Sequence, residues 1–583
     1  MLKKLSKSIR EYKKASILSP IFVSLEVLME VLIPTLMAKL VDFGIDKGNM
    51  NYIIKIGIVL ALFAFISLIF GMLAGKYAAF ASSGFAKNIR KDMYYKVQQY
   101  SFANIDKFSS ASIVTRLTTD VTNLQNAYQM IVRVAVRAPI MFIFAFIMSF
   151  KTSAKLALII LCCAPVLAAG LYLIIRFAHP IFELVFKTYD KLNRVVQENL
   201  RGMRVVKSFV REDYENEKFK SISEEIYRDF SKAEKILAFN MPLMQFSAYT
   251  CIIFISWLGA RMIVASGNNP DIGFTTGQLM SFMTYLMQIL MSLMMLSMVF
   301  VMVTISRASA ERIVEILDEE SDIVSPENPV MDVKDGSVLY KNVSFSYSKR
   351  MDKLCLNNIN IRIDAGQTVG IIGGTGSSKS SLVQLIPRLY DVTEGQLFVG
   401  GIDVREYDLE TLRNNVAMVL QKNVLFSGTI KENLRWGNEN ATDEEIERVC
   451  RLAQADSFIQ TFPDKYNTYI EQGGSNVSGG QKQRLCIARA LLKKPKILVM
   501  DDSTSAVDTK TDALIREAML HEIPDTTKII IAQRISSVQE ADIIIVMDNG
   551  EINGIGTHEE LLGNNEIYKE VFESQVKGAE DNE

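Results

Sequence analysis

A glycine- and serine-rich stretch of the sequence has the composition of a phosphate-binding loop. It is Gly373–Ser381, GGTGSSKSS, and it directly follows the apolar segment TVGII. The pattern G-x-x-x-x-G-K-[ST] places backbone N–H groups around phosphates, a lysine against the β and γ oxygens and a hydroxyl on Mg²⁺. Lys379 and Ser380 fit this pattern, whereas Ser378 stands where its last glycine is expected. The residues expected to bind the phosphates are Gly373, Gly374, Thr375, Gly376, Ser377, Ser378, Lys379, Ser380 and Ser381.

A second apolar segment ends in two carboxylates. The segment ILVMDD occupies residues 497–502 and reads as a buried strand that ends at Asp501 and Asp502. The position of Asp501 fits the carboxylate that orients Mg²⁺ and its water in phosphoryl-transfer sites. We therefore expect the chain to bind ATP with Mg²⁺, and the hydroxyl of Ser380 and the carboxylate of Asp501 to hold the metal.

Between these two motifs lies NVSGGQKQR, Asn476–Arg484. Its VSGGQ part is similar to the LSGGQ signature of the ATP-binding cassette (ABC) superfamily, and the order phosphate loop, signature and acidic strand is highly specific. The chain therefore resembles this superfamily, and the resemblance extends over nearly its whole length, as a six-helix exporter half fused to one cassette. The signature residues that it places at a nucleotide are Ser478, Gly479, Gly480 and Gln481.

The resemblance implies roles for further residues. Tyr347 is similar to the aromatic residue that stacks on adenine. Gln421 resembles the Q-loop residue that joins the Mg²⁺ site to the membrane domain, and is expected among the catalytic residues and metal ligands. Ser505–Asp508 resembles the D-loop, whose Asp508 is expected near the nucleotide. Segments near Asn104–Thr115 and Phe209–Glu215 resemble the coupling helices that dock onto nucleotide-binding domains.

Two residues depart from the family pattern where hydrolysis needs them. The residue after Asp501 is normally a glutamate that acts as general base on the attacking water, but here it is Asp502, whose carboxylate lies one methylene further back. The switch histidine is replaced by Gln533, which can form hydrogen bonds but cannot carry a proton. Each change alone is compatible with neutral drift. Together with Ser378 they predict a site that binds ATP and hydrolyses it slowly.

The signature, in contrast, is intact. In the family each ATP lies between the phosphate loop of one chain and the signature of another, and this chain shows no internal duplication. Dimerisation is therefore expected. The asymmetry of intact signature and altered catalytic residues resembles heterodimeric bacterial exporters, so we expect a second half-transporter as partner, in preference to a homodimer.

The composition indicates one membrane half and one soluble half. The 583 residues are 49% hydrophobic and 22% charged, and the mean hydropathy is +0.16. This average is too apolar for an ordinary soluble enzyme and too charged for a pure membrane protein. The net charge of -1 gives no global basic field, so no nucleic-acid partner is expected. The six cysteines form no C-x-x-C pair, which argues against a disulfide framework or a zinc site.

Long runs without charged residues predict six transmembrane helices. Five such runs lie between residues 56 and 306, and a sixth span near Ile17–Val41 is interrupted by Glu26 and Glu30. The basic N-terminus and the nearly uncharged external loops place both termini and the nucleotide-binding domain in the cytoplasm, and the protein in the cell membrane. Residues 1–14 are expected to form an amphipathic elbow helix on the inner membrane surface. The two long charged segments between spans are expected to be cytoplasmic extensions of the helices.

Charged residues inside the spans and a methionine stripe mark a candidate substrate cavity. Glu26 and Glu30 share one helical face, as do Arg133 and Arg137. They either pair with one another, which we favour, or line a polar cavity wall. The methionines of the last span fit a permissive pocket, although packing or lipid contact is the simpler alternative. The cavity candidates are Glu26, Glu30, Arg133, Arg137, Met287, Met291, Met294 and Met298.

The expected fold class is an all-α six-helix transmembrane domain with long cytoplasmic helix extensions, fused to an α/β P-loop nucleotide-binding domain. The expected domains are the elbow helix 1–14, the transmembrane domain 15–311, a linker 312–335 and the nucleotide-binding domain 336–583. The resemblance implies an ATPase that couples ATP binding and hydrolysis to outward transport of an amphipathic small molecule, peptide or lipid. A lipid flippase, or a regulatory ABC protein without net transport, is the alternative.

Overall fold

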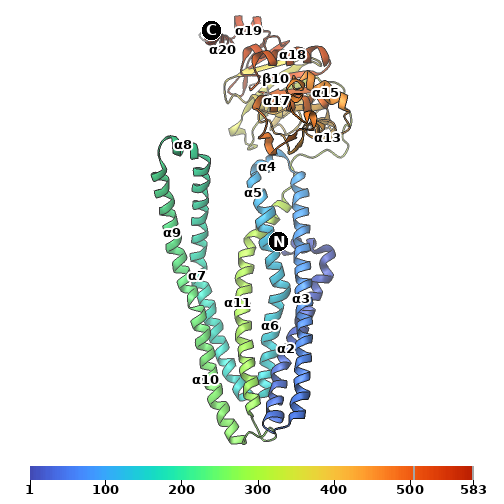
Figure 1. Ribbon diagram of the computed structural model, residues 1–583. Helices are drawn as coiled ribbons and strands as arrows, with labels where there is room; N and C mark the ends of the chain where they lie inside the picture. The colour runs from blue at the N-terminus through green and yellow to red at the C-terminus, as the bar shows by residue number, and fades with distance from the viewer. Residues whose placement is uncertain (503–505, 581–583) are drawn as a thin grey trace. The chain divides into compact units, whose positions relative to one another are not determined.

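The computed structural model describes residues 1–502 and 506–580, and these fold into two compact units. The first, called the membrane unit, comprises Met1–Gln98 and Ser110–Glu319; the second, called the nucleotide unit, comprises Gln99–Ser109 and Glu320–Glu583. The short segment 99–109 thus folds with the nucleotide unit although helices of the membrane unit flank it on both sides. Figure 1 shows the elements of both units.

The membrane unit is entirely helical. Helices α2 (Lys13–Leu40), α3 (Met50–Gln98), α6 (Val121–Thr152) and α11 (Thr276–Asp318) pack together, and α7 (Ala154–Arg201) lies beside α9 (Glu212–Ala238) and α10 (Asn240–Ser266), as Figure 1 shows. The shorter elements are α1 (Leu2–Leu5), η1 (Ser6–Tyr12), η2 (Val41–Ile45), α5 (Ser110–Thr115), η3 (Arg116–Asp120) and α8 (Met203–Ser208).

The described residues contain six helical segments that are long and apolar enough to cross a membrane, which confirms the predicted number. Helix α7 has 48 residues. At 1.5 Å per residue it is roughly 70 Å long, more than twice the ~30 Å of the hydrocarbon core. Such helices must therefore continue beyond the bilayer, as the mixed charged and apolar pattern of the long segments predicted.

The structure differs from the sequence-based expectation at both ends of this unit. Residues 1–14 do not form one helix, because Arg10 adopts a left-handed backbone (φ 40°) that breaks the helical path. Helix α11 continues to Asp318, so residues 312–318, expected in the linker, are helical. The pattern of the last span gave no helix-stop signal at Glu311, and the amphipathic sequence ERIVEILD extends the helix for two more turns.

The nucleotide unit contains two main sheets. Strands β1 (Val338–Phe345), β2 (Leu356–Ile363), β4 (Glu394–Val399) and β5 (Ile402–Asp403) form an antiparallel sheet in the order β2-β1-β4-β5. The second sheet has the order β12-β11-β3-β10-β9-β6 and is parallel except for β12. Its strands are β3 (Thr368–Gly373), β6 (Val416–Val419), β9 (Ile497–Asp501), β10 (Thr527–Ile531), β11 (Ile543–Asp548) and β12 (Glu551–Gly556).

The helices of this unit are mostly short. They are α4 (Phe102–Phe108), η4 (Met351–Lys353), α12 (Lys379–Gln384), α13 (Leu409–Asn415), α14 (Ile430–Arg435), α15 (Asp443–Leu452), α16 (Asp456–Ile459), η5 (Lys465–Asn467), η6 (Gln472–Gly474), α17 (Gly479–Leu492), α18 (Thr509–Glu522), η7 (Ile535–Ser537), α19 (His558–Asn564) and α20 (Glu566–Glu580). Helices α12, α13, α17 and α20 pack against strands of the parallel sheet. A two-stranded sheet of β7 (Gly428–Thr429) and β8 (Tyr469–Ile470) completes the fold.

The parallel sheet brings the ends of three strands together. Ile531 of β10 lies opposite Asp501 of β9 on one side and Ile371 of β3 on the other. The loops that follow these strands therefore start at the same edge, which is where open α/β sheets bind ligands. Residues of β9 and β10 are buried along their whole length, as expected for strands of a parallel sheet with both faces covered.

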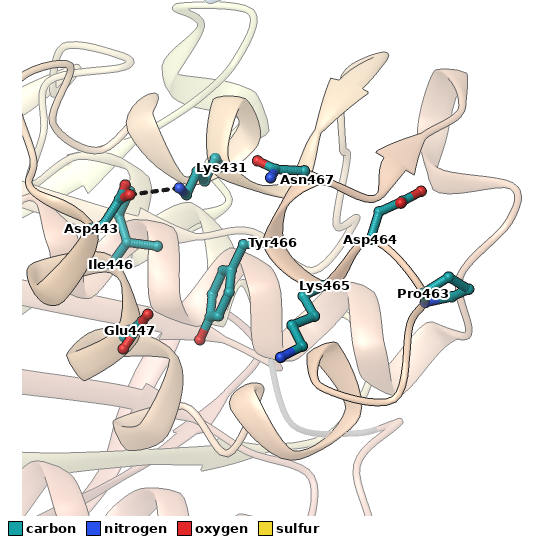
Figure 2. A pocket seen from close by; sticks show the side chains of 9 residues that line it. All are labelled: Lys431, Asp443, Ile446, Glu447, Pro463, Asp464, Lys465, Tyr466 and Asn467. Carbon is teal, nitrogen blue, oxygen red and sulfur yellow. Dashed lines mark hydrogen bonds and ion pairs between the residues drawn. The ribbon is translucent and has the colours of Figure 1, made fainter.

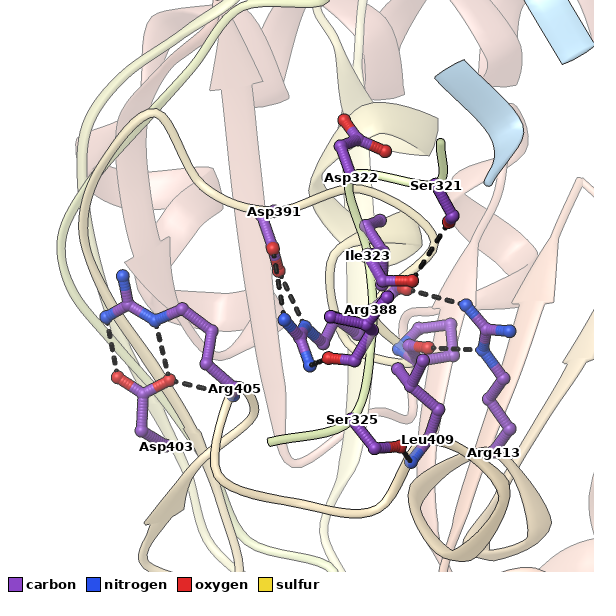
Figure 3. A network of polar contacts seen from close by, with 12 residues as sticks. Ser321, Asp322, Ile323, Ser325, Arg388, Asp391, Asp403, Arg405, Leu409 and Arg413 are labelled. Carbon is purple, nitrogen blue, oxygen red and sulfur yellow. Dashed lines mark hydrogen bonds and ion pairs between the residues drawn. The ribbon is translucent and has the colours of Figure 1, made fainter. Parts of the chain in front are cut away.

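Polar contacts hold the chain that enters the nucleotide unit, as Figure 3 shows. Buried Arg388 donates a hydrogen bond to the backbone oxygen of Val324 at 3.1 Å and pairs with Asp391 at 2.7 Å. The hydroxyl of Ser325 donates to Asp408 at 3.0 Å and accepts the backbone N–H of Leu409 at 3.0 Å. Residues 324 and 325, expected in a linker, are thus fixed to the surface of the unit.

Candidate functional site

The phosphate-loop residues form a tight turn between β3 and α12. Gly373 has φ 158°, and a Cβ there would collide with the backbone oxygen of Met547. Gly376 has φ 87° and Ser378 has φ 67°, both in the left-handed region. A side chain in that region costs roughly 1–2 kcal/mol. Ser378 therefore takes the glycine-like conformation that the pattern demands, in spite of its Cβ.

The ammonium group of Lys379 lies at the centre of this loop. Its Nζ donates to the backbone oxygens of Gly373 (2.9 Å) and Gly374 (2.8 Å) and to Ser377 Oγ (3.2 Å). The pKa of Lys379 lies below its ordinary value because burial disfavours the charged form, while the charges of Asp501 and Asp502 act in the opposite direction. The loop thus surrounds one positive charge with backbone groups, an arrangement suited to a polyphosphate.

Replacing Lys379 with Ala is expected to lower the affinity of this chain for ATP about 30-fold, because a charge-assisted hydrogen bond to the phosphates contributes about 2 kcal/mol. The measurement is ultraviolet cross-linking of 8-azido-ATP, with the labelled chains separated on a gel. Lys569→Ala removes an exposed lysine of α20 as a control. Equal labelling of both variants would contradict the assignment of Lys379.

Ser380 and Asp501 are joined across the end of the sheet. Ser380 Oγ donates to Asp501 Oδ1 at 2.9 Å. Asp501 is 3% exposed, and its pKa is raised, mainly by burial, while the hydrogen bond from Ser380 lowers it. A hydroxyl and a carboxylate oxygen are the ligand types that Mg²⁺ prefers. Gln421, expected as a further metal ligand, lies exposed after β6 and makes no hydrogen bond within the described residues.

The two residues that depart from the family pattern contact each other. Gln533 Nε2 donates a hydrogen bond to Asp502 Oδ2 at 2.7 Å. Asp502 has φ 48° and follows β9, whereas Gln533 follows β10. Because β9 and β10 are paired, residues 31 positions apart meet at the strand ends. Asp502, which stands at the position of the general base, is therefore already hydrogen-bonded to the side-chain amide of Gln533.

Tyr347 is half exposed next to the phosphate loop. Its hydroxyl is hydrogen-bonded to Ser381 Oγ at 2.9 Å, and the residue is 51% exposed. The ring centroids of Phe345 and Tyr390 lie 4.9 Å and 5.1 Å away in edge-on arrangements. The pKa of Tyr347 is raised, mainly by burial. An exposed aromatic face beside a phosphate loop is suited to stacking on a nucleotide base.

The signature residues start helix α17. Ser478 is its N-cap: its Oγ accepts the N–H of Gln481 at 3.3 Å, and Gln481 Oε1 accepts the N–H of Ser478 at 2.9 Å. A Cβ on Gly480 would approach the backbone oxygen of Ala506 at 2.8 Å. In the D-loop region Ser505 lies outside the described residues. Asp508 caps α18 by accepting the N–H of Thr511 at 2.9 Å, which lowers its pKa.

In the membrane unit, Arg137 pairs with both glutamates of α2. Its guanidinium lies 2.5 Å from Glu26 and 2.7 Å from Glu30. Arg133, one turn earlier, makes no ion pair or hydrogen bond with any residue that the structure describes. A Cβ on Gly71 of α3 would lie 3.1 Å from Glu26, so this glycine leaves room for the carboxylate. The predicted pairing between the glutamates and the arginines is therefore made by Arg137 and not by Arg133.

Glu30 and Arg137 line a cavity of about 260 Å³ together with methionines of α11. Met287, Met291 and Met295 face it. Met294 and Met298 instead line a second cavity of about 470 Å³, to which Met295 also contributes. Sequence reasoning missed Met295, although its spacing of four from Met291 and three from Met298 places it on the same helical face.

Replacing Arg137 with Met is expected to lower the free energy of unfolding by about 3 kcal/mol, because it leaves the buried carboxylate of Glu26 and the half-buried carboxylate of Glu30 without their cation. Thermal unfolding of the detergent-solubilised protein measures this loss. Arg133→Met is the matched control, because it removes from the same helix an arginine that has no ion-pair partner in the described part of the chain. Similar midpoints for the two variants would show that the Glu26–Arg137–Glu30 cluster does not stabilise the fold.

A surface pocket of about 310 Å³ lies elsewhere on the nucleotide unit. Figure 2 shows its lining, which includes the ion pair of Lys431 and Asp443 at 2.7 Å. The pocket lies between α14, α15 and η5, and its lining residues belong to none of the nucleotide motifs. It is therefore separate from the candidate nucleotide site.

Comparisons with known proteins agree with this geometry. The ABC transporter transmembrane region matches residues 16–312, and the ABC transporter domain matches residues 356–505. The ABC transporter ATP-binding protein YfiB of Bacillus subtilis is 36% identical over 550 residues, covering 94% of each chain. An ABC transporter ATP-binding protein of Mycobacterium tuberculosis is 35% identical over 584 residues, covering 99% of each chain.

A solved structure has the same fold. The structure of a bacterial Atm1-family ABC exporter with ATP bound matches with a TM-score of 0.83 at 23% identity, covering 97% of this chain and 99% of that chain. The fold and site define a multi-pass membrane ATPase with one transmembrane domain and one ATP-binding domain, that is, a half-transporter with the fold of an ABC exporter. The chain belongs to the ABC transporter family.

Proposed function

We propose that this chain is one subunit of an ATP-driven exporter in which its own nucleotide site binds ATP with Mg²⁺ and hydrolyses it slowly. The observation that carries the proposal is the hydrogen bond from Gln533 to Asp502. A general base must lie within hydrogen-bond reach of the attacking water. Asp502 is shorter than the usual glutamate, and its Oδ2 accepts a hydrogen bond from the amide of Gln533. This amide cannot take up the proton that a general base removes from water.

In this proposal Lys379 and the phosphate loop hold the phosphates, Tyr347 stacks on adenine, and Ser380 and Asp501 hold Mg²⁺. The metal would neutralise charge on the β- and γ-phosphates. Gln421 would join this site on nucleotide binding, since it lies in a loop and has no hydrogen bond among the described residues. Both termini and the nucleotide unit are cytoplasmic in this arrangement, in agreement with the basic N-terminus.

The proposed partner is a different half-transporter. Ser478 and Gln481 form a complete capping box at the start of α17, so the signature of this chain is structurally intact. Such a signature can complete a nucleotide site on a partner that retains its glutamate and histidine. Two copies of this chain would contain two altered sites, which favours the heterodimer. ATP can close such a pair only through its different affinity for the open and closed states.

The proposed substrates are amphipathic compounds that contact the membrane unit near Glu30, Arg137, Met287 and Met291. These residues line one cavity of about 260 Å³, in which flexible methionines surround one charged cluster. Methionine side chains can adapt to ligands of different shape. The same surface would accept a lipid, so outward transport of lipids remains the second candidate.

The test starts with affinity purification of the tagged chain from native membranes in mild detergent, followed by mass spectrometry. We expect a second half-transporter in equal amounts, with Glu and His at the positions of Asp502 and Gln533. The purified complex is then placed in liposomes, and ATPase rate and flux of candidate compounds are measured. Recovery of this chain alone would contradict the heterodimer, and ATP binding without flux of any drug, peptide or lipid would contradict transport.

A further inference from the structure

Segment 99–109 packs on the nucleotide unit through an aromatic cluster formed by Phe102, Phe345, Tyr347 and Tyr390. The Tyr390 ring lies at the centre of this cluster. Its centroid is 6.0 Å from Phe102 of α4, 5.7 Å from Phe345 and 5.1 Å from Tyr347, and the last pair is perpendicular. Rings at these separations and angles attract one another beyond simple burial.

A hydrogen bond joins the same tyrosine to α4. Tyr390 Oη donates to Asp106 Oδ2 at 2.8 Å. The pKa of Tyr390 is raised, first by burial and then by this contact with the Asp106 carboxylate. One side chain therefore contacts both the candidate adenine platform, Tyr347, and the segment whose two ends continue directly into α3 and α5 of the membrane unit.

We propose that Tyr390 is a positioning residue that couples occupation of the Tyr347 platform by a nucleotide base to the docking of segment 99–109, through its hydrogen bond to Asp106. The inference rests on the proposed binding of ATP to this chain. A base that stacks on Tyr347 restrains its ring and thereby the perpendicular ring of Tyr390. Because coupling between sites is reciprocal, release of Asp106 from Tyr390 must also weaken binding of the base.

The coupling depends on the base and not on the phosphates. Tyr347 is joined to the phosphate loop by the bond of its hydroxyl to Ser381 at 2.9 Å, whereas its ring packs edge-on against the rings of Phe345 and Tyr390. The triphosphate contacts Lys379 and Ser380 in the proposed site, and the hydrogen bonds that these two side chains make among the described residues go to the loop itself and to Asp501. Inorganic triphosphate is therefore a probe that occupies the loop and leaves the platform open.

Hydrogen exchange in the purified complex tests this inference. Peptides from segment 99–109 and from the phosphate loop 373–381 are followed without nucleotide, with Mg²⁺ and ATP, and with Mg²⁺ and inorganic triphosphate. In the unmodified protein we expect ATP to slow exchange in both peptides, by about fivefold in segment 99–109, the size expected for one hydrogen bond. Triphosphate should slow exchange only in the phosphate loop.

Three variants isolate the hydrogen bond. Tyr390→Phe keeps the ring and removes the donor, and Asp106→Ala removes the acceptor. Both should lose the ATP effect on segment 99–109 and keep it in the phosphate loop, and the double variant should lose no more than either alone. Asp106→Asn keeps an acceptor oxygen and should behave as the unmodified protein. Affinity of this chain for 8-azido-ATP should fall a few-fold in the first two variants only.

Distinct results would overturn the two proposals. Slower exchange of segment 99–109 that persists in Tyr390→Phe, or that triphosphate also produces, would overturn the coupling. The coupling would also be overturned if ATP slows exchange in the phosphate loop and leaves exchange in segment 99–109 unchanged. Identical behaviour of Asp106→Asn and Asp106→Ala would overturn it as well. If ATP leaves even the phosphate loop unchanged, the proposed binding of ATP to this chain fails first.

Discussion

The double replacement Asp502→Glu and Gln533→His is expected to raise ATP hydrolysis at this chain's own site by roughly 100-fold, the lower range of what a positioned general base contributes. The glutamate extends the carboxylate by one methylene toward the attacking water. The histidine removes the amide that now donates to Asp502 at 2.7 Å and supplies a group that can carry a proton. The two replacements act on one contact, so their effects should not be additive.

A readout specific to this chain is needed, because the partner's site would dominate total ATPase activity. The complex is loaded with radiolabelled 8-azido-ATP, incubated for a single turnover and cross-linked, and the ratio of di- to triphosphate on this chain is measured. Asp502→Asn is the control, and it should leave the slow rate unchanged. Rapid hydrolysis by the unmodified chain that Asp502→Asn abolishes would show that Asp502 already works as a general base.

Ser478→Ala is expected to lower the ATPase rate of the assembled transporter by about 100-fold, a loss of about 3 kcal/mol in the transition state. In the proposed dimer the hydroxyl of Ser478 and the first N–H groups of α17 face the γ-phosphate held by the partner. Helix N-termini favour such anions. The hydrolysis lost would therefore belong to the partner's site, and nucleotide labelling of this chain should remain unchanged.

A matched control separates this effect from the loss of a helix cap. Ser478 also caps α17, and removing an N-cap costs about 1 kcal/mol of stability. Thr557 forms the same capping box at the start of α19, with its Oγ1 accepting the N–H of Glu560 at 3.4 Å. Thr557→Ala should lower the unfolding temperature by a similar amount and leave ATPase activity intact. Normal turnover in Ser478→Ala would refute the shared site.

Much of this architecture could be predicted from local patterns. Each of three features consists of consecutive residues: the phosphate loop after TVGII, the acids after ILVM, and the six apolar runs. They can be recognised in the sequence because a strand, a turn and a membrane span depend on near neighbours. The same holds for the departures at Ser378, Asp502 and Gln533, each of which is visible as a single residue out of pattern. The family, the fold class and six spans followed from these features.

The tertiary structure decided which of these residues meet. Asp502 and Gln533 contact each other because β9 and β10 are neighbours in the sheet, and strand order cannot be deduced from the pattern within a strand. Arg137 forms ion pairs with both glutamates, and Arg133 forms none with them. The packing of α6 against α2 decides which of the two arginines, one helical turn apart, faces the glutamates. The placement of segment 99–109 in the nucleotide unit depends likewise on rings that lie nearly 300 residues apart in the chain, such as Phe102 and Tyr390. Local sequence thus determined the helices, strands and loops and the chemistry of their residues. Packing between elements far apart in the chain determined which of these residues contact each other.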